Sequence, residues 1–279
     1  MEYIRSIDWL ANHLHDADVC IIDCRFDLSD PAAGEQQYKK GHIPGAYYAH
    51  LDRHLSGEKS KHGGRHPLPD IEVFRQTVEA FGITDTTTVV AYDGGEAMFA
   101  GRFWWLLSYI GHKHVYILDG GFDEWRKQGL PVSVDIPAPG QGSVSIGIQK
   151  EWTASLEEVR KAALEKDGTI LVDSRAPERY EGKTEPLDRV PGHIPGAINH
   201  FFKEGFNGSF WKSEEAQTQR FQSLDPKRPI IVYCGSGVSA TPNIIALKQA
   251  GFQNVRLYAG SYSDWSSYEE LPVEKRTEK

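Results

Sequence analysis

The hexapeptide Gly-His-Ile-Pro-Gly-Ala occurs at residues 41–46 and again, letter for letter, at residues 192–197. Self-similarity at a long spacing is the signature of a duplicated structural unit. Each copy follows a β-branched apolar run that ends in Asp-x-Arg, within residues 20–26 and 170–176. Further matching segments follow each copy in the same order: 88–95 with 229–236, and 115–125 with 255–265. The sequence therefore predicts two tandem copies of one fold.

In each copy short apolar strands alternate with helical stretches, such as residues 100–111 and 242–251. This alternation is typical of a mainly parallel sheet with helices on both faces. The predicted fold class is therefore α/β, with two tandem domains. A segment rich in Pro, Gly and Ser separates the copies and is expected to be a linker. We predict a first domain over residues 1–136, a linker over 137–150 and a second domain over 151–279.

The repeated hexapeptide itself is expected to be structural. Pro44 and Pro195 fix φ, and the flanking glycines permit a tight turn. His42 and His193 are then turn residues and not catalysts.

Composition limits the partners and the compartment. Lys and Arg number 31 against 39 Asp and Glu, a formal charge of -8, which argues against nucleic acid as a partner. No segment approaches the roughly 18 apolar residues of a membrane span, and no signal peptide precedes the first repeat. The cysteines, Cys20, Cys24 and Cys234, contain no CxxC pair, so neither a disulfide framework nor a zinc site is expected. We predict a cytoplasmic protein.

The two copies differ at one position that matters for chemistry. Alignment of the repeats sets Asp93 of the first copy against Cys234 of the second, at the carboxyl end of a predicted strand. Ligands of α/β sheets bind beyond such ends. Gly235 and Gly237 permit a loop whose amides surround the sulfur, and the helix that follows favours negative charge. Cys234 is therefore the predicted nucleophile, whereas Cys20 and Cys24 are expected to be packing residues.

One alternative enzyme class shares a strand–Cys–loop–helix arrangement. A cysteine phosphatase needs an arginine closing the loop to stabilise the charge on the phosphoryl group. Residues 239–241 are Ser, Ala and Thr, so this alternative is disfavoured.

The doubled hexapeptide, the loop "CGSGVSA" and the "DGG…EW" segment resemble the tandem-domain rhodaneses over residues 7–273. Within that family the loop is similar to that of the 3-mercaptopyruvate sulfurtransferases, with Ser239 in place of a threonine. Thiosulfate-preferring members carry Arg and Lys directly after the cysteine, whereas this loop is uncharged. The resemblance implies a non-catalytic first domain and a catalytic second domain.

The resemblance also implies roles for individual residues. It maps a serine–histidine–aspartate constellation onto Ser236, His66 and Asp52, although His54 and His62 lie close to His66 in the sequence. The donor is expected to be bound by two arginines and the loop: Arg179, Arg189, Gly235, Gly237, Val238 and Ser239.

The predicted reaction is a double displacement through a persulfide on Cys234. A small-molecule donor, 3-mercaptopyruvate or thiosulfate, gives up a sulfur atom, and a thiol or cyanide then takes it. The acceptor is expected to be a low-molecular-weight thiol or a thioredoxin-like protein, and no metal or organic cofactor is required. Two alternatives stay open: a thiosulfate-preferring rhodanese, and an inactive tandem rhodanese that acts as a binding or sulfur-sensing module.

Overall fold

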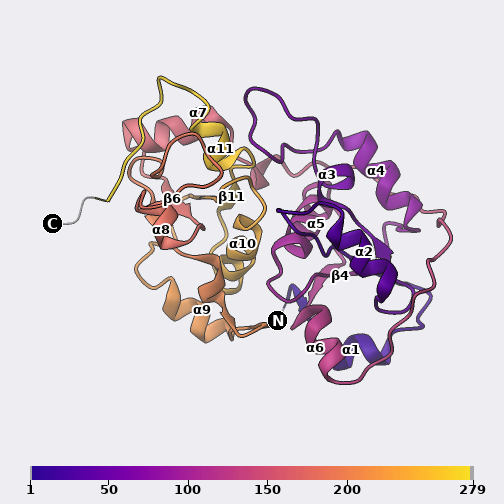
Figure 1. Cartoon of the computed structure of the whole chain (residues 1–279). Coiled ribbons are helices and arrows are strands. Elements are labelled where there is room, and N and C mark those ends of the chain that lie inside the picture. The colour runs from indigo at the N-terminus through magenta and orange to yellow at the C-terminus, as the bar shows by residue number, and fades with distance from the viewer. Residues whose placement is uncertain (1, 277–279) are drawn as a thin grey trace. The chain divides into compact units, whose positions relative to one another are not determined.

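The computed structural model describes residues 2–276 and forms two compact units, each described by itself here (Figure 1). The first unit comprises residues up to 57, residues 68–149 and the short segment 206–211. The second unit comprises the segment 58–67 together with residues 150–205 and those from 212 onward. Each unit therefore includes a short segment from the opposite half of the sequence. The predicted boundaries at residues 136 and 150 stay a prediction, which limited proteolysis would test.

Each unit is built on one parallel sheet. In the first unit the strand order is β1-β5-β4-β2-β3, and in the second it is β11-β10-β6-β7. All adjacent strands in both sheets are parallel. The strands of the first sheet are β1 (Ile4–Arg5), β2 (Val19–Asp23), β3 (Tyr47–Tyr48), β4 (Thr88–Tyr92) and β5 (Val115–Leu118). Those of the second sheet are β6 (Ile170–Asp173), β7 (Ile198–Asn199), β10 (Ile230–Tyr233) and β11 (Val255–Leu257).

Helices connect the strands of each sheet (Figure 1). Those of the first unit are α1 (Ile7–Asn12), α2 (Ala33–Lys40), α3 (Leu51–His54), α4 (Ile71–Ala80), α5 (Met98–Tyr109) and α6 (Gly121–Lys127). Those of the second unit are α7 (Leu156–Arg160), α8 (Pro177–Tyr180), α9 (Glu214–Arg220), α10 (Ala240–Gln249) and α11 (Ser261–Trp265). Short 3₁₀ helices at Lys150–Trp152 and Phe202–Gly205 and a π-helix at Lys161–Glu165 complete the second unit. A hairpin of β8 (Phe206–Asn207) and β9 (Phe210–Trp211) belongs to the first unit.

The central strand of each sheet is buried on both faces. In β4, Val90 and Tyr92 pack into one core with Trp125 of α6, while Val89 and Ala91 point to the other face and are equally buried. Strand β10 follows the same alternation in the second unit. Parallel sheets need cover on both faces, which explains why these strands read as continuous apolar runs. The structure confirms the predicted fold class.

The repeated motifs of the sequence are tied together in space. In the first unit the Arg25 guanidinium pairs with Asp23 at 2.6 Å and donates to the carbonyl of Gly41 at 2.7 Å. The second unit repeats this arrangement, because Arg175 pairs with Asp173 and donates to the carbonyl of Gly192. Each Asp-x-Arg therefore fixes the start of the hexapeptide that follows it. This shared contact explains why both motifs recur together.

The histidines of the hexapeptides have structural roles, as predicted. The His42 ring stacks on Tyr38 at 4.0 Å, and its Nδ1 lies 2.8 Å from the carbonyl oxygen of that residue. The His193 ring stacks on Tyr180 in the same way, at 3.9 Å.

The two long helices that follow the central strands begin and end two residues earlier than the pattern predicts. α5 covers Met98–Tyr109 and α10 covers Ala240–Gln249. Both end near a glycine in the left-handed region, Gly111 at φ +102° and Gly251 at φ +89°. Such glycines commonly close helices because they lack Cβ. In the part of the chain that the structure describes, no helix combines the length and apolarity of a membrane span.

Candidate active site

Cys234 lies directly after β10 and is 1% exposed. The backbone N–H of Gly237 donates to its sulfur at 3.1 Å, so the loop folds back over the thiol. Gly237 has φ +75°, and a Cβ added there would lie 2.3 Å from the carbonyl oxygen of Ala259. Both facts require glycine at this position. The sequence-based expectation of an amide facing the sulfur is confirmed for Gly237.

Ser261 fixes the backbone of Cys234. Its hydroxyl oxygen accepts the Cys234 N–H at 3.1 Å and donates to the carbonyl of Tyr258 at 2.9 Å. Ser261 has φ +56°, a conformation that costs a non-glycine residue on the order of 1 kcal/mol. The corresponding residue of the first unit is Gly121, at φ +61°. Sequence reasoning missed Ser261, although a serine opposite a glycine in aligned repeats was the available signal.

The other two cysteines, Cys20 and Cys24, are buried, and their thiols are only weakly acidic. Burial raises the pKa of Cys20 to about 12. Burial, with the charges of Asp23 and Asp93, raises the pKa of Cys24 well above its usual value. Both thiols are therefore protonated at neutral pH, in agreement with the predicted packing role.

His66 contacts the loop of Cys234. Its Nδ1 lies 2.8 Å from the hydroxyl oxygen of Ser236, and both side chains are buried. The structure thus distinguishes His66 from its neighbours: His62 instead lies 2.7 Å from the hydroxyl of Ser267 and stacks on Tyr268.

The segment 58–67 carries His66 and is tied to α11 and the residues flanking it. The Gly63 N–H donates to Asp264 at 2.7 Å, and the Arg65 N–H donates to the hydroxyl of Ser263 at 3.1 Å. Gly64 packs so closely that an added Cβ would lie 2.4 Å from the carbonyl oxygen of Gly260. These contacts place the histidine against the loop that follows Cys234. Asp52 belongs to α3 of the first unit, and its pairing with His66 stays a prediction.

Two arginines lie against the loop. A Cβ added to Gly235 would lie 2.8 Å from an Arg65 guanidinium nitrogen and 3.4 Å from Arg179. The carboxylate of Asp188 bridges them, because Arg65 pairs with one oxygen and Arg179 with the other. Arg179 also pairs with Glu185 at 2.7 Å. Both guanidinium groups are therefore held beside the loop that follows Cys234.

The two acids of this cluster respond differently to burial. Burial raises the pKa of Asp188, despite the opposing charges of Arg65 and Arg179. Burial also acts on Glu185, but the hydrogen bond and charge of Arg179 and two backbone N–H groups outweigh it and lower its pKa. Glu185 is anchored by Arg175 at 3.1 Å as well. Sequence reasoning missed Arg65 and Asp188, although Arg65 directly precedes His66 and Asp188 directly precedes Arg189.

The remaining predicted residues differ in their placement. Arg189 is exposed, and its Nε donates to the carbonyl of Ser266 at 2.7 Å, at the end of α11. Val238 is buried, and its carbonyl accepts the Thr241 hydroxyl at 2.8 Å. Ser239 is the residue that precedes α10, with φ in the helical range. Their contacts with a donor stay predictions.

Comparison with known proteins agrees with this geometry. The family described as the rhodanese-like domain matches residues 6–128 and 155–268. A relative from Pseudomonas aeruginosa named "Probable 3-mercaptopyruvate sulfurtransferase" is 42% identical, covering 95% of each chain. An Arabidopsis thaliana protein named thiosulfate/3-mercaptopyruvate sulfurtransferase 2 is 32% identical, covering 98% of this chain and 86% of its own.

A solved structure is also similar to this chain. The crystal structure of SseA from Escherichia coli, described as a 3-mercaptopyruvate sulfurtransferase with the rhodanese fold, superposes with a TM-score of 0.83 at 30% identity. The superposition covers 94% of this chain and all of that one. The present chain therefore belongs to the rhodanese-like family, as a tandem member, and is an enzyme of the sulfurtransferase type.

Proposed function

We propose that this enzyme takes a sulfur atom from 3-mercaptopyruvate onto Cys234 and passes it to a thiol. The observation that carries the proposal is the loop after β10, where the Gly237 amide faces the Cys234 sulfur and Ser236 contacts His66. An amide at the sulfur stabilises negative charge there, and a serine–histidine pair beside it can move a proton.

The first half-reaction forms the persulfide. The Cys234 thiolate attacks the sulfur of 3-mercaptopyruvate, a new S–S bond forms and the C–S bond of the donor breaks. The electron pair of that bond leaves as the enolate of pyruvate, which takes one proton to become pyruvate. Ser236, in contact with His66, supplies that proton in this proposal, and the pair is reprotonated from solvent.

The second half-reaction returns the enzyme to its starting state. An acceptor thiolate attacks the outer sulfur, the S–S bond to Cys234 breaks and the Cys234 thiolate is restored. The acceptor gains one sulfur atom, so no external oxidant or reductant is needed. A small thiol or a thioredoxin-like protein fits this role, and its thiol chemistry suits a reducing compartment such as the cytoplasm.

Donor choice follows from the charges around the loop. Arg179 and Arg65 can bind the planar carboxylate of mercaptopyruvate through their forked N–H groups. Asp188 already neutralises part of their charge, which makes the site less suited to the dianion thiosulfate. Arg189 stays a further predicted donor residue. A thiosulfate-preferring enzyme remains the second candidate, because the Arabidopsis relative carries both donors in its name.

One assay tests the proposal directly. Pyruvate release from mercaptopyruvate, sulfite release from thiosulfate, and sulfide formation with each donor should be measured in the presence of a thiol acceptor. We expect mercaptopyruvate to give pyruvate and sulfur in equal amounts and to be used with the higher kcat/KM. A higher kcat/KM for thiosulfate would favour the second candidate, and no turnover of either donor would favour a binding module.

A further inference from the structure

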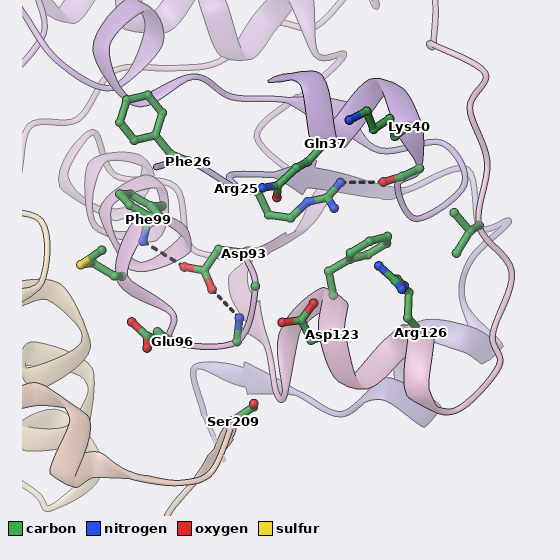
Figure 2. A pocket seen from close by; sticks show the side chains of 16 residues that line it. Arg25, Phe26, Gln37, Lys40, Asp93, Glu96, Phe99, Asp123, Arg126 and Ser209 are labelled. Atoms are coloured by element: carbon green, nitrogen blue, oxygen red, sulfur yellow. Dashed lines mark hydrogen bonds between the residues drawn. The ribbon is translucent and has the colours of Figure 1, made fainter. Parts of the chain in front are cut away.

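A cavity lies in the first unit, at the carboxyl ends of its central strands. Its volume is about 820 Å³, within the range of small-molecule sites. It contains the loop that starts at Asp93, the repeat position of Cys234 (Figure 2). Ser209, on the hairpin β8–β9, lies against Gly95 and lines the same cavity.

The loop amides of this cavity are already occupied. The Asp93 carboxylate accepts N–H bonds from Gly95 and Ala97 at 3.0 Å, and from Phe99 and Ala100 at 3.0 and 3.2 Å. Figure 2 shows the bonds from Gly95 and Phe99. Asp93 is itself 3% exposed. The internal carboxylate therefore fills the position in which an anionic ligand could meet the amides. A ligand of this cavity must be recognised by side chains instead.

Two cationic side chains lining the cavity have no ion pair within residues 2–276. Lys40 and Arg126 are exposed and line the cavity. The neighbour of Lys40, Lys39, pairs with Glu35 at 2.7 Å. Arg25 also lines the cavity, but its guanidinium is committed to Asp23. Positive charge is therefore available at Lys40 and Arg126.

The other part of the cavity carries two aromatic rings and the carboxylate of Glu96. Figure 2 shows Phe26 and Phe99 toward one side of the view and Lys40 and Arg126 toward the other. Phe122 lines the cavity nearer the cations, because its ring centroid lies 3.9 Å from the Arg25 guanidinium and 5.9 Å from that of Arg126. Aromatic walls with a few convergent charges are typical of sites for small organic acids.

The exposed charged residues of this cavity have no charged counterparts at the aligned positions of the second sequence copy. In the aligned segments Arg126 corresponds to Ser266, and Asp123, which also lines the cavity, corresponds to Ser263. Lys40 precedes the first hexapeptide, where the second copy has Pro191. The cavity thus combines two exposed cations with three carboxylates, Asp93, Glu96 and Asp123, at positions where the second copy has Cys234, Gly237 and Ser263. Its ligand therefore differs from the sulfur donor.

We propose that this cavity binds a small aromatic monoanionic acid, with its acid group at Lys40 and Arg126 and its ring against Phe99 and Phe122. Two exposed carboxylates, Asp123 and Glu96, also line the cavity, so a single negative charge fits better than two. This site goes beyond the proposed sulfur transfer and does not depend on it.

Calorimetric titration of the full-length protein with 2-naphthoate tests the proposal, with neutral 2-naphthalenemethanol as the uncharged comparison. We expect saturable 1:1 binding of naphthoate that weakens as salt rises, because exposed charges are screened. The Lys40→Ala/Arg126→Ala variant should bind naphthoate roughly tenfold or more weakly, as expected on losing charge-assisted hydrogen bonds. The alcohol should bind the wild type and this variant equally weakly.

The matched control is Lys39→Ala/Arg53→Ala, which removes the same charge from residues that both pair with Glu35 outside the cavity. This control should bind naphthoate like the wild type. The proposal is overturned if the wild type does not bind naphthoate at millimolar concentration, or if both double variants weaken binding equally. Sulfur transfer, measured separately, should be unchanged in Lys40→Ala/Arg126→Ala without added acid, so the two proposals fail independently.

Discussion

The hydroxyl oxygen of Ser236 lies 2.8 Å from Nδ1 of His66, although the two residues are 170 positions apart in the sequence. His66 lies in the first sequence repeat and Ser236 in the second, yet both belong to the second compact unit. The contact exists because the segment 58–67 packs on the residues around α11. The pair lies beside Cys234, in the loop whose Gly237 amide faces the sulfur.

This contact predicts that the two donors respond differently to mutation. His66→Ala and Ser236→Ala should each lower mercaptopyruvate turnover by roughly a hundredfold, because the leaving enolate needs a proton. Thiosulfate releases sulfite, which needs none, and should be affected far less. The double variant should cost little more than either single change, since members of one relay are non-additive. Steady-state kinetics with both donors checks this, and full additivity would contradict a relay.

A second prediction concerns the three thiols. Cys234 should be alkylated by iodoacetamide much faster than Cys20 and Cys24 at pH 8. Burial raises the pKa of Cys20 to about 12, so its thiolate is scarce at that pH, and burial also raises the pKa of Cys24 well above its usual value. Peptide mass spectrometry over time gives the three rates.

The same method identifies the carrier of sulfur. After treatment with mercaptopyruvate, a mass increase of one sulfur atom should appear on Cys234 alone. Cys234→Ser should lose this increase and all sulfur transfer while unfolding at the wild-type temperature. A persulfide on Cys20 or Cys24 would exclude the assignment.

A third prediction separates the arginines beside the loop. Arg179→Ala and Arg65→Ala should each lower kcat/KM for mercaptopyruvate by roughly tenfold to a hundredfold, with a smaller loss for thiosulfate. Arg179→Lys should recover little, because an ammonium lacks the forked geometry. Arg160→Ala is the control, since Arg160 is exposed and pairs with Glu157 on α7. Equal losses with both donors would mean that the arginines supply only general positive potential.

A fourth prediction concerns Asp93. Asp93→Asn should lower the free energy of unfolding by roughly 2 to 4 kcal/mol, because an amide NH₂ cannot accept two of the four backbone N–H bonds. Chemical denaturation measures the change. Asp123→Asn, at an exposed residue of the same cavity, should be near neutral. Equal stability of both variants would contradict the structural role given to Asp93.

A fifth prediction is a dependence of stability on pH. Burial, aided by Arg220, lowers the pKa of His200 to about 4, and burial likewise lowers that of His54 to about 4. The unfolded state binds the extra protons between pH 6.5 and 4, so stability should fall as pH decreases through that window. The loss is on the order of 3 kcal/mol per histidine. Denaturation from pH 7.5 to 4 should show a shallower fall for His200→Leu, and an unchanged slope would contradict the assignment.

Much of the fold follows from sequence alone. The duplicated hexapeptide, the Asp-x-Arg runs and the apolar strands predict two α/β units, because each motif has a local physical reason to be where it is. The positions of Cys234 and Gly237 were also predictable from local chemistry. Cys234 ends an apolar strand, and Gly237 has the left-handed conformation that favours glycine. Short edge strands such as β3 and β7, of two residues each, carry too little pattern to be predicted.

Only the tertiary structure brought the charged groups to the loop. The sequence places His54, His62 and His66 close together, and nothing local separates them. Packing of the segment 58–67 selects His66 and brings Arg65 to Asp188. Side-chain pairing between distant segments depends on where each backbone finally packs, which no local periodicity encodes. The sequence by itself therefore determined the two units and singled out Cys234, whose role as nucleophile stays a prediction. Tertiary packing decided which charges surround this residue.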